Sequence, residues 1–217
     1  MKFRSISVAI LSLTIVIACV CEVSAQRKLI SLEDYSKATL PVSSKSREMT
    51  RRVVGTEETI MDGVVTKTVE TIIEAVVSAG SRFFVKTSEG EKISEIERIN
   101  VNSIWYVRNN GGAWNKEGDD PSRRMEIGGG LSSPGCLQYS VDSVFLNGRQ
   151  TQVFEALSVS SKANELVFNQ IRMWVDVDGL PYREEHTLGK MAPRIETYRS
   201  VSMYEYDPNI KIEKPIK

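Results

Sequence analysis

The chain has 217 residues, and its 28 basic and 28 acidic side chains give a formal net charge of zero. This balance excludes the strongly basic surface that nucleic-acid phosphates require, so we expect no nucleic-acid partner. It also excludes a polybasic stripe for binding anionic membranes. The length fits a single domain with a sizeable hydrophobic core.

Residues 1–25 have the pattern of a secretory signal peptide. Lys2 and Arg4 form a short positive region, residues 6–17 are apolar or hydroxylic, and Ala25 ends a small-residue cleavage site. The apolar run is too short to be a membrane anchor. We therefore predict that the protein is exported and that the mature chain is periplasmic.

The end of this segment has two interpretations. Cleavage after Ala25 would leave Cys136 as the single thiol of the mature chain, so that no internal disulfide could form. Alternatively, residues 16–19 (VIAC) resemble a bacterial lipobox, and Cys19 would then be lipidated and anchor the protein to the outer membrane. The two sites predict different mature proteins, one soluble and one attached to a membrane.

A polar segment with weak periodicity, residues 26–50, follows the signal peptide. Residues 31–34 (SLED) resemble a helix-capping signal, so we predict a short helix that begins near Leu32. Pro41 lacks the N–H that an interior helical position donates, and it is expected to end the helix. Residues 43–46 are predicted to form a loop.

From residue 51 onward, apolar and polar residues alternate between turn signals, which predicts antiparallel strands. The clearest case is residues 171–188, where aliphatic side chains continue at every second position as far as Val177 and precede the turn-forming pair Asp178-Gly179. The returning strand begins at Pro181. We expect nine to eleven strands in one long meander; the best-defined cover residues 51–61, 64–79, 83–87, 92–99, 104–108, 141–146, 149–159, 165–177 and 195–206.

The alternation stops between residues 117 and 137. Runs of Gly, Pro and Asp in this stretch cannot form a regular strand, and the run Gly128–Gly130 lacks the lysine and the spacing of phosphate-binding loops. A loop of this length in a compact domain is either functional or disordered. We predict a mobile flap with a short helical turn near residues 123–127.

The sequence contains no recognisable motif for catalysis or metal binding. His186, the only histidine, lies beside Glu184 and Glu185 without the nucleophile or the further ligands that a catalytic or metal site needs. Asp176 and Asp178 lack the remaining oxygens of a calcium loop and are explained by turn formation. We therefore predict a non-enzymatic protein with no metal and no cofactor.

A meander of this length has little helix to cover the apolar face of its sheet, and that face must be buried against something. The sheet could close into a barrel, fold into a sandwich, or curl around a ligand or a few short helices. Small residues at positions 65, 75, 77 and 79 leave room on the long early strands and favour a cavity. The alternative is a barrel filled by its own side chains.

Three segments carry a resemblance: IWYVRNNGGAW at residues 104–114, MWVDVDGLPYREE at 173–185 and YEYDPNIKIEKP at 204–215. They resemble the LolA/LolB-like superfamily of envelope lipoprotein carriers and related bacterial lipid-binding proteins. The resemblance covers residues 51–217 and implies a mainly β fold, an antiparallel open half-barrel with one or two short helices on its concave face. The chain would then consist of a signal peptide (1–25), an N-terminal helix and linker (26–50) and the half-barrel domain (51–217).

The resemblance also implies a function, the binding of lipid or of lipoprotein acyl chains in the apolar half-barrel, with carriage of this cargo as one role. An envelope protein is the expected partner for such a carrier, and a monomer is the expected state. The alternative function is that of a structural or protein-interaction domain of the envelope. The residues predicted to bind lipid are Val69, Ile73, Val77, Phe83, Val85, Trp105, Val107, Met173 and Val175.

Overall fold

The computed structural model describes most of the chain that follows the predicted signal peptide. The signal peptide itself, with Cys19, lies outside the described residues, as do residues 118–135 of the predicted flap. No helix in the described part of the chain has the length and apolar character needed to cross a bilayer. The described residues are 27–77, 79–117, 136–146, 148–162, 165–191 and 194–215.

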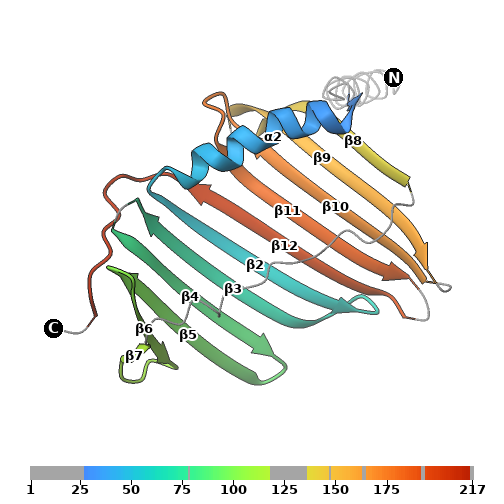
Figure 1. Cartoon of the computed structure of the whole chain (residues 1–217). Helices are drawn as coiled ribbons and strands as arrows, with labels where there is room; N and C mark the ends of the chain where they lie inside the picture. The colour runs from blue at the N-terminus through green and yellow to red at the C-terminus, as the bar shows by residue number, and fades with distance from the viewer. Residues whose placement is uncertain are drawn as a thin grey trace, which may run out of the picture.

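In the described part of the chain, twelve strands form one antiparallel sheet in the order β1-β8-β9-β10-β11-β12-β2-β3-β4-β5-β6-β7, and one helix, α2, lies across it (Figure 1). Strands β1 and β7 are the two edges and do not pair with each other, so the sheet is open, as predicted for a half-barrel. The elements are β1 (Lys28–Ile30), α2 (Leu32–Arg47), β2 (Arg51–Met61), β3 (Val64–Val76), β4 (Gly80–Glu89), β5 (Lys92–Val101), β6 (Ile104–Asn109), β7 (Asn115–Glu117), β8 (Cys136–Leu146), β9 (Arg149–Lys162), β10 (Glu165–Val175), β11 (Pro181–Met191) and β12 (Glu196–Glu205).

The structure has more strands than the nine to eleven that the sequence predicts. The difference lies partly in β1 and β7, which have three residues each and are too short to display a periodicity of two. Both strands are recognisable only through their pairing, β1 with β8 and β7 with β6.

The predicted hairpin is present as β10 and β11. The Asp176 carboxylate accepts hydrogen bonds from the backbone N–H groups of Asp178 and Leu180, at 3.0 and 3.2 Å, and Gly179 has φ = +70°. The aspartate and the glycine therefore form the turn, as the sequence indicates. Strand β10 nevertheless ends at Val175, and Val177, which continues the apolar alternation, is 82% exposed in the turn.

Cross-strand partners in an antiparallel sheet point to the same side, so the registers sort the side chains onto two faces. Met173 in β10 is opposite Phe154 in β9, which in turn is opposite Val141 in β8. These residues pack with α2, and we call this side the helix face. Side chains at the alternate positions, such as Arg172 and Glu155, lie on the opposite face.

Helix α2 begins where the capping signal predicts. The Ser31 hydroxyl accepts a hydrogen bond from the Asp34 N–H at 3.1 Å. The prediction that Pro41 ends the helix is wrong, because α2 continues through it to Arg47 and includes the residues expected to form a loop. Packing of the following turn offsets the lost hydrogen bond: Val42 is 7% exposed against the sheet, and the hydroxyls of Ser46 and Tyr206 are 2.9 Å apart.

The main hydrophobic core lies between α2 and strands β8 to β10. Val42, Phe154, Met173 and Val175 are buried there, and Tyr35 packs its ring against the rings of Tyr139 and Phe154, with centroids 4.9 and 6.5 Å away. This core lies beneath α2, which crosses the sheet near one end of its strands (Figure 1). Strands β3 to β6 lie beyond the helix (Figure 1).

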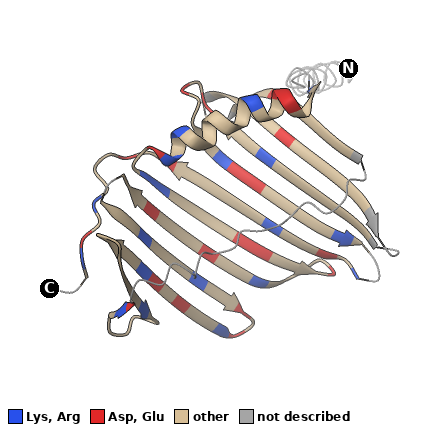
Figure 2. Ribbon diagram, in the orientation of Figure 1, with Lys and Arg blue, Asp and Glu red and all other residues tan. Residues whose placement is uncertain are grey.

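Charged side chains recur in bands across neighbouring strands (Figure 2). On the opposite face, alternating arginine and glutamate side chains form an ion-pair ladder across β2 to β6. A second group of ion pairs on this face centres on the buried Glu155, which pairs with Arg27 and Arg172. The ion-pair ladder consists of Arg52, Glu74, Arg82, Glu97 and Arg108.

Candidate functional site: an apolar patch on the helix face

The structure brings six of the nine predicted lipid-binding residues together on one part of the helix face. Register places Ile73 of β3 opposite Phe83 of β4, and the Phe83 ring lies 5.8 Å from the ring of Trp105 in β6. All six side chains are half-buried. With two further aliphatic neighbours on the same face they form what we call the apolar patch: Val53, Val69, Ile73, Phe83, Val85, Ile96, Trp105 and Val107.

The other three predicted residues lie elsewhere. Met173 and Val175 are each 4% exposed and belong to the core beneath α2, so a ligand could reach them only if the helix moved. Val77 follows the last residue of β3 and is 50% exposed at that end of the sheet. The predicted residues that a ligand could reach on the sheet therefore lie on β3, β4 and β6.

One charged side chain lies within the apolar patch. Arg98 in β5 is opposite Phe83 on one side and Val107 on the other, so its guanidinium emerges among apolar side chains. Its Nε atom is buried and has no hydrogen-bond partner, and among the described residues no carboxylate forms an ion pair with it. Other arginines of the sheet, such as Arg82 and Arg108 on the opposite face, pair with glutamate.

Sequence reasoning missed Arg98 because β5 reads KISEIERINV, with apolar and charged residues at both parities. Its periodicity therefore does not indicate which of its side chains belong to the helix face. The register with β4 decides this, since it places Arg98 opposite Phe83 and Glu97 opposite Phe84.

A polar strip separates the apolar patch from the core beneath α2. In this strip Glu57, Ser200 and His186 are aligned across β2, β12 and β11. The His186 Nε2 atom is 2.7 Å from the Asn169 side-chain oxygen, and burial lowers the pKa of the imidazole. The helix face is therefore not apolar throughout, contrary to what the alternation in β10 alone suggests.

Two tyrosines complete the polar strip. The Tyr204 hydroxyl donates a hydrogen bond to Glu184, and burial raises the pKa of both Tyr204 and Tyr198. Both phenols are thus hydrogen-bond donors at neutral pH. The described residues contain no group of three or more His, Cys, Asp or Glu side chains arranged to hold a metal.

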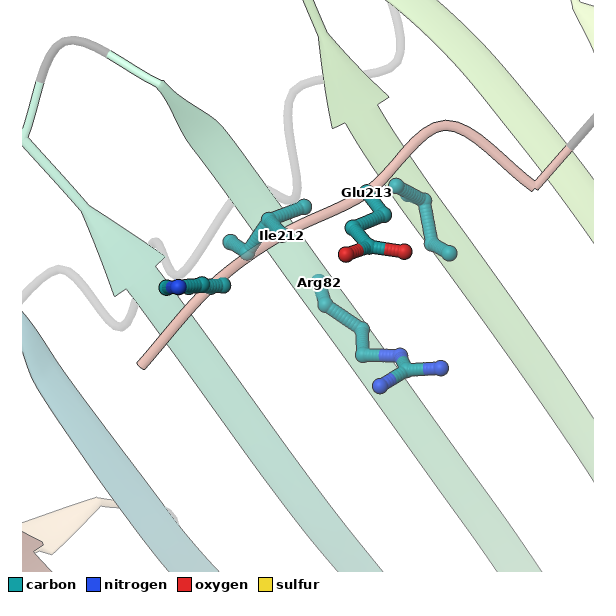
Figure 3. A pocket seen from close by; sticks show the side chains of 5 residues that line it. Arg82, Ile212 and Glu213 are labelled. Carbon is teal, nitrogen blue, oxygen red and sulfur yellow. The ribbon is translucent and has the colours of Figure 1, made fainter. Parts of the chain in front are cut away.

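One hollow of the surface lies on the opposite face. It has a volume of about 270 Å³ and is formed where the C-terminal tail crosses the sheet, with Ile212 and Glu213 above Arg82 (Figure 3). The tail continues to Lys214, whose Nζ lies 5.8 Å from the centre of the Tyr106 ring. A second hollow, of about 50 Å³, lies beside Glu97. None of the nine predicted lipid-binding residues lines either hollow.

Comparison with known proteins finds similarity to solved structures but not to known sequences. No protein-family model matches the sequence, and neither does any curated protein. The chain is similar to LprF from Mycobacterium bovis, with 11% identity and a TM-score of 0.44 over 85% of this chain and 98% of that one. It is also similar to a domain from Vibrio parahaemolyticus classed as an outer membrane lipoprotein-sorting protein, with 8% identity and a TM-score of 0.32 over 83% of this chain and 95% of that one.

Proposed function

We propose that this protein binds an acyl chain of a lipid or lipoprotein on the apolar patch, and that it does so without chemical conversion of the ligand. The observation that supports this most directly is the gathering of aliphatic and aromatic side chains on the helix face of β2 to β6, most of them half-buried, away from the core beneath α2. An apolar surface left open to water is stabilised by an apolar partner.

The driving force would be the removal of hydrocarbon from water. Each methylene buried contributes about 0.8 kcal/mol, so affinity should rise about fourfold with each carbon added until the patch is covered. The arrangement of these residues in a row across several strands suits a flexible chain better than a compact ligand. We infer a carrier role from this, because a ligand held on an open surface can leave without unfolding the protein.

The cellular setting is part of the proposal and rests on the sequence. We propose export to the bacterial envelope through residues 1–25, with either a soluble periplasmic chain or an anchor at Cys19. The expected partners are a lipid or the acyl chains of a lipoprotein, together with an envelope protein that receives the cargo from a monomeric carrier.

A second candidate function is that of a structural or protein-interaction domain. The filled core beneath α2 favours it, because Met173, Val175 and Phe154 are already buried by the protein's own side chains. On this view another protein, rather than a lipid, would cover the apolar patch.

Direct measurement of acyl-chain uptake separates the two functions. Mature protein is titrated with fluorescent fatty-acid analogues of increasing chain length, and the mass of the recovered ligand is measured by mass spectrometry. We expect uptake of unchanged ligand. If the folded protein takes up no acyl ligand at any chain length, the binding function is wrong and the interaction domain replaces it. If the recovered ligand is altered, the claim of binding without conversion is wrong.

A matched pair of variants on β3 locates the binding surface. Ile73→Ser removes aliphatic surface from the apolar patch, whereas Ile72→Ser makes the same change one residue away on the opposite face. We expect Ile73→Ser to weaken uptake by about fivefold, since a half-buried isoleucine can give a ligand roughly 1 kcal/mol. Ile72→Ser should leave uptake unchanged. Equal losses in the two variants would contradict binding on the helix face.

A further inference from the structure

We propose that Arg98 binds the carboxylate of a fatty-acid ligand and so fixes the polar end of the acyl chain on β5. This inference rests on the proposed function and adds to it a ligand class, a long-chain carboxylate, and a direction of binding. The site consists of Arg98 and the apolar residues around it, with Phe83 in β4 and Val107 in β6 as its direct cross-strand neighbours.

The first reason is the missing partner. The buried Nε atom of Arg98 has no hydrogen bond, and no described carboxylate pairs with its guanidinium. A buried donor without a partner is costly, and a charge among apolar side chains more so. On the opposite face, Glu97 compensates both Arg82 and Arg108. Among the described residues, Arg82 and Arg108 thus share a carboxylate on the opposite face, whereas Arg98 has none and could accept one from a ligand.

The second reason is the charge around Arg98. Its neighbours along β5 on the helix face are Ile96 and Asn100, and neither is acidic. Glu117 of β7 shares this face, but it is opposite Trp105 and already has an interaction partner. A single cation beside apolar side chains matches a ligand with one compact negative group attached directly to hydrocarbon. A carboxylate also accepts two parallel hydrogen bonds from the guanidinium fork.

The third reason is the course that the helix face offers to the chain. From Arg98, a row of cross-strand partners crosses the sheet through Phe83 and Ile73 to Val53 in β2. The next residue in that row is Tyr204, which belongs to the polar strip. Three strand spacings of about 4.8 Å give roughly 14 Å of apolar surface, enough for an extended chain of roughly a dozen carbons. The affinity gain per carbon should therefore end near this length.

The test compares dodecanoate with its uncharged methyl ester, which has the same alkyl chain, at pH 8 where the acid is ionised. Wild-type protein should bind dodecanoate more tightly than the ester. Arg98→Gln should weaken dodecanoate binding by roughly 10- to 100-fold, the loss expected for a hydrogen-bonded charge pair, and leave ester binding within about threefold. Arg199→Gln, an exposed arginine on the opposite face, is the control and should behave as wild type.

Arg98→Lys provides a second variant with the charge retained and the fork lost. It should keep part of the preference for dodecanoate, and thermal unfolding of each variant shows that it is folded. The inference is overturned if wild type binds dodecanoate and the ester equally, or if Arg98→Gln binds dodecanoate as tightly as wild type does. In either case, binding of the ester would still support the proposed function. Tighter binding of dodecyl phosphate than of dodecanoate would overturn the assignment of a carboxylate. Failure of wild type to bind any of the three ligands would overturn the proposed function itself.

Discussion

Glu97 should be the residue on which the ion-pair ladder depends. Its carboxylate accepts hydrogen bonds from Arg82 Nε at 2.9 Å and from Arg108 Nε at 2.7 Å, and its side chain is only 9% exposed. The change Glu97→Gln keeps the shape of the side chain and one acceptor oxygen. The other oxygen becomes an amide N–H₂ group that faces a guanidinium donor, so one of the two arginines loses its partner.

The size of the effect follows from these contacts. A hydrogen bond to a charged group contributes about 1.5–3 kcal/mol, and breaking a fully buried pair costs about 3–5 kcal/mol. The side chains of Arg82 and Arg108 are 45% and 35% exposed, so water partly replaces the lost partner. We therefore expect the free energy of unfolding to fall by about 2 kcal/mol, which lowers the Tm by about 4–8 °C for a domain of this size.

Glu70→Gln is the matched control, on strand β3 of the same face. Glu70 is 56% exposed and has a single ion pair, with Lys86 at 3.6 Å, so its loss should cost no more than about 0.5 kcal/mol. Both variants are unfolded in urea, with the midpoint and the slope compared with wild type. If Glu97→Gln loses no more stability than Glu70→Gln, the ladder does not stabilise the sheet in the way described.

Two further predictions concern the helix and the polar strip. Pro41→Ala should restore a hydrogen bond to the Lys37 carbonyl and raise the Tm by a few degrees. An interior proline destabilises a helix by about 3 kcal/mol, and its restriction of the unfolded chain offsets only part of this cost. A lower Tm in the variant would contradict this reasoning. Burial lowers the pKa of His186 below its ordinary value of 6.5, so its contribution to stability is complete above pH 6.5 and is lost as the pH falls from 6.5 through the lowered pKa. An NMR titration of the imidazole should give a midpoint below 6.5, and His186→Gln should reduce the loss of stability in urea unfolding between pH 7.5 and 5.5. A midpoint above 6.5 would show that the nearby Glu184 outweighs burial.

Some of the candidate site could be predicted from the sequence because the relevant signals are local. A strand shows its two faces through a period of two, so Ile73, Phe83 and Val107 could each be assigned to an apolar side before any pairing was known. The registers place all three on the same face of the sheet. Met173 has the same local pattern, but α2 covers it, and no pattern within β10 indicates that.

The sequence by itself determined the elements and the turns between them. Side-chain alternation defines strands, Asp and Gly stabilise tight turns through their own backbone preferences, and Ser31 marks the helix start by capping it; all of these act within a few residues. They are sufficient for a mainly β chain built from antiparallel hairpins, which is what the structure shows.

Only the tertiary structure decided how these elements combine. The pairing of β12 with β2, the extension of α2 beyond Pro41 and the position of Arg98 within the apolar patch all depend on contacts between residues far apart in the sequence. The physical reason is that a period of two says which residues share a face of one strand but not which strand lies beside it. For Arg98 that neighbour, Phe83 in β4, makes the difference between an ordinary surface charge and a cation that lies among apolar side chains.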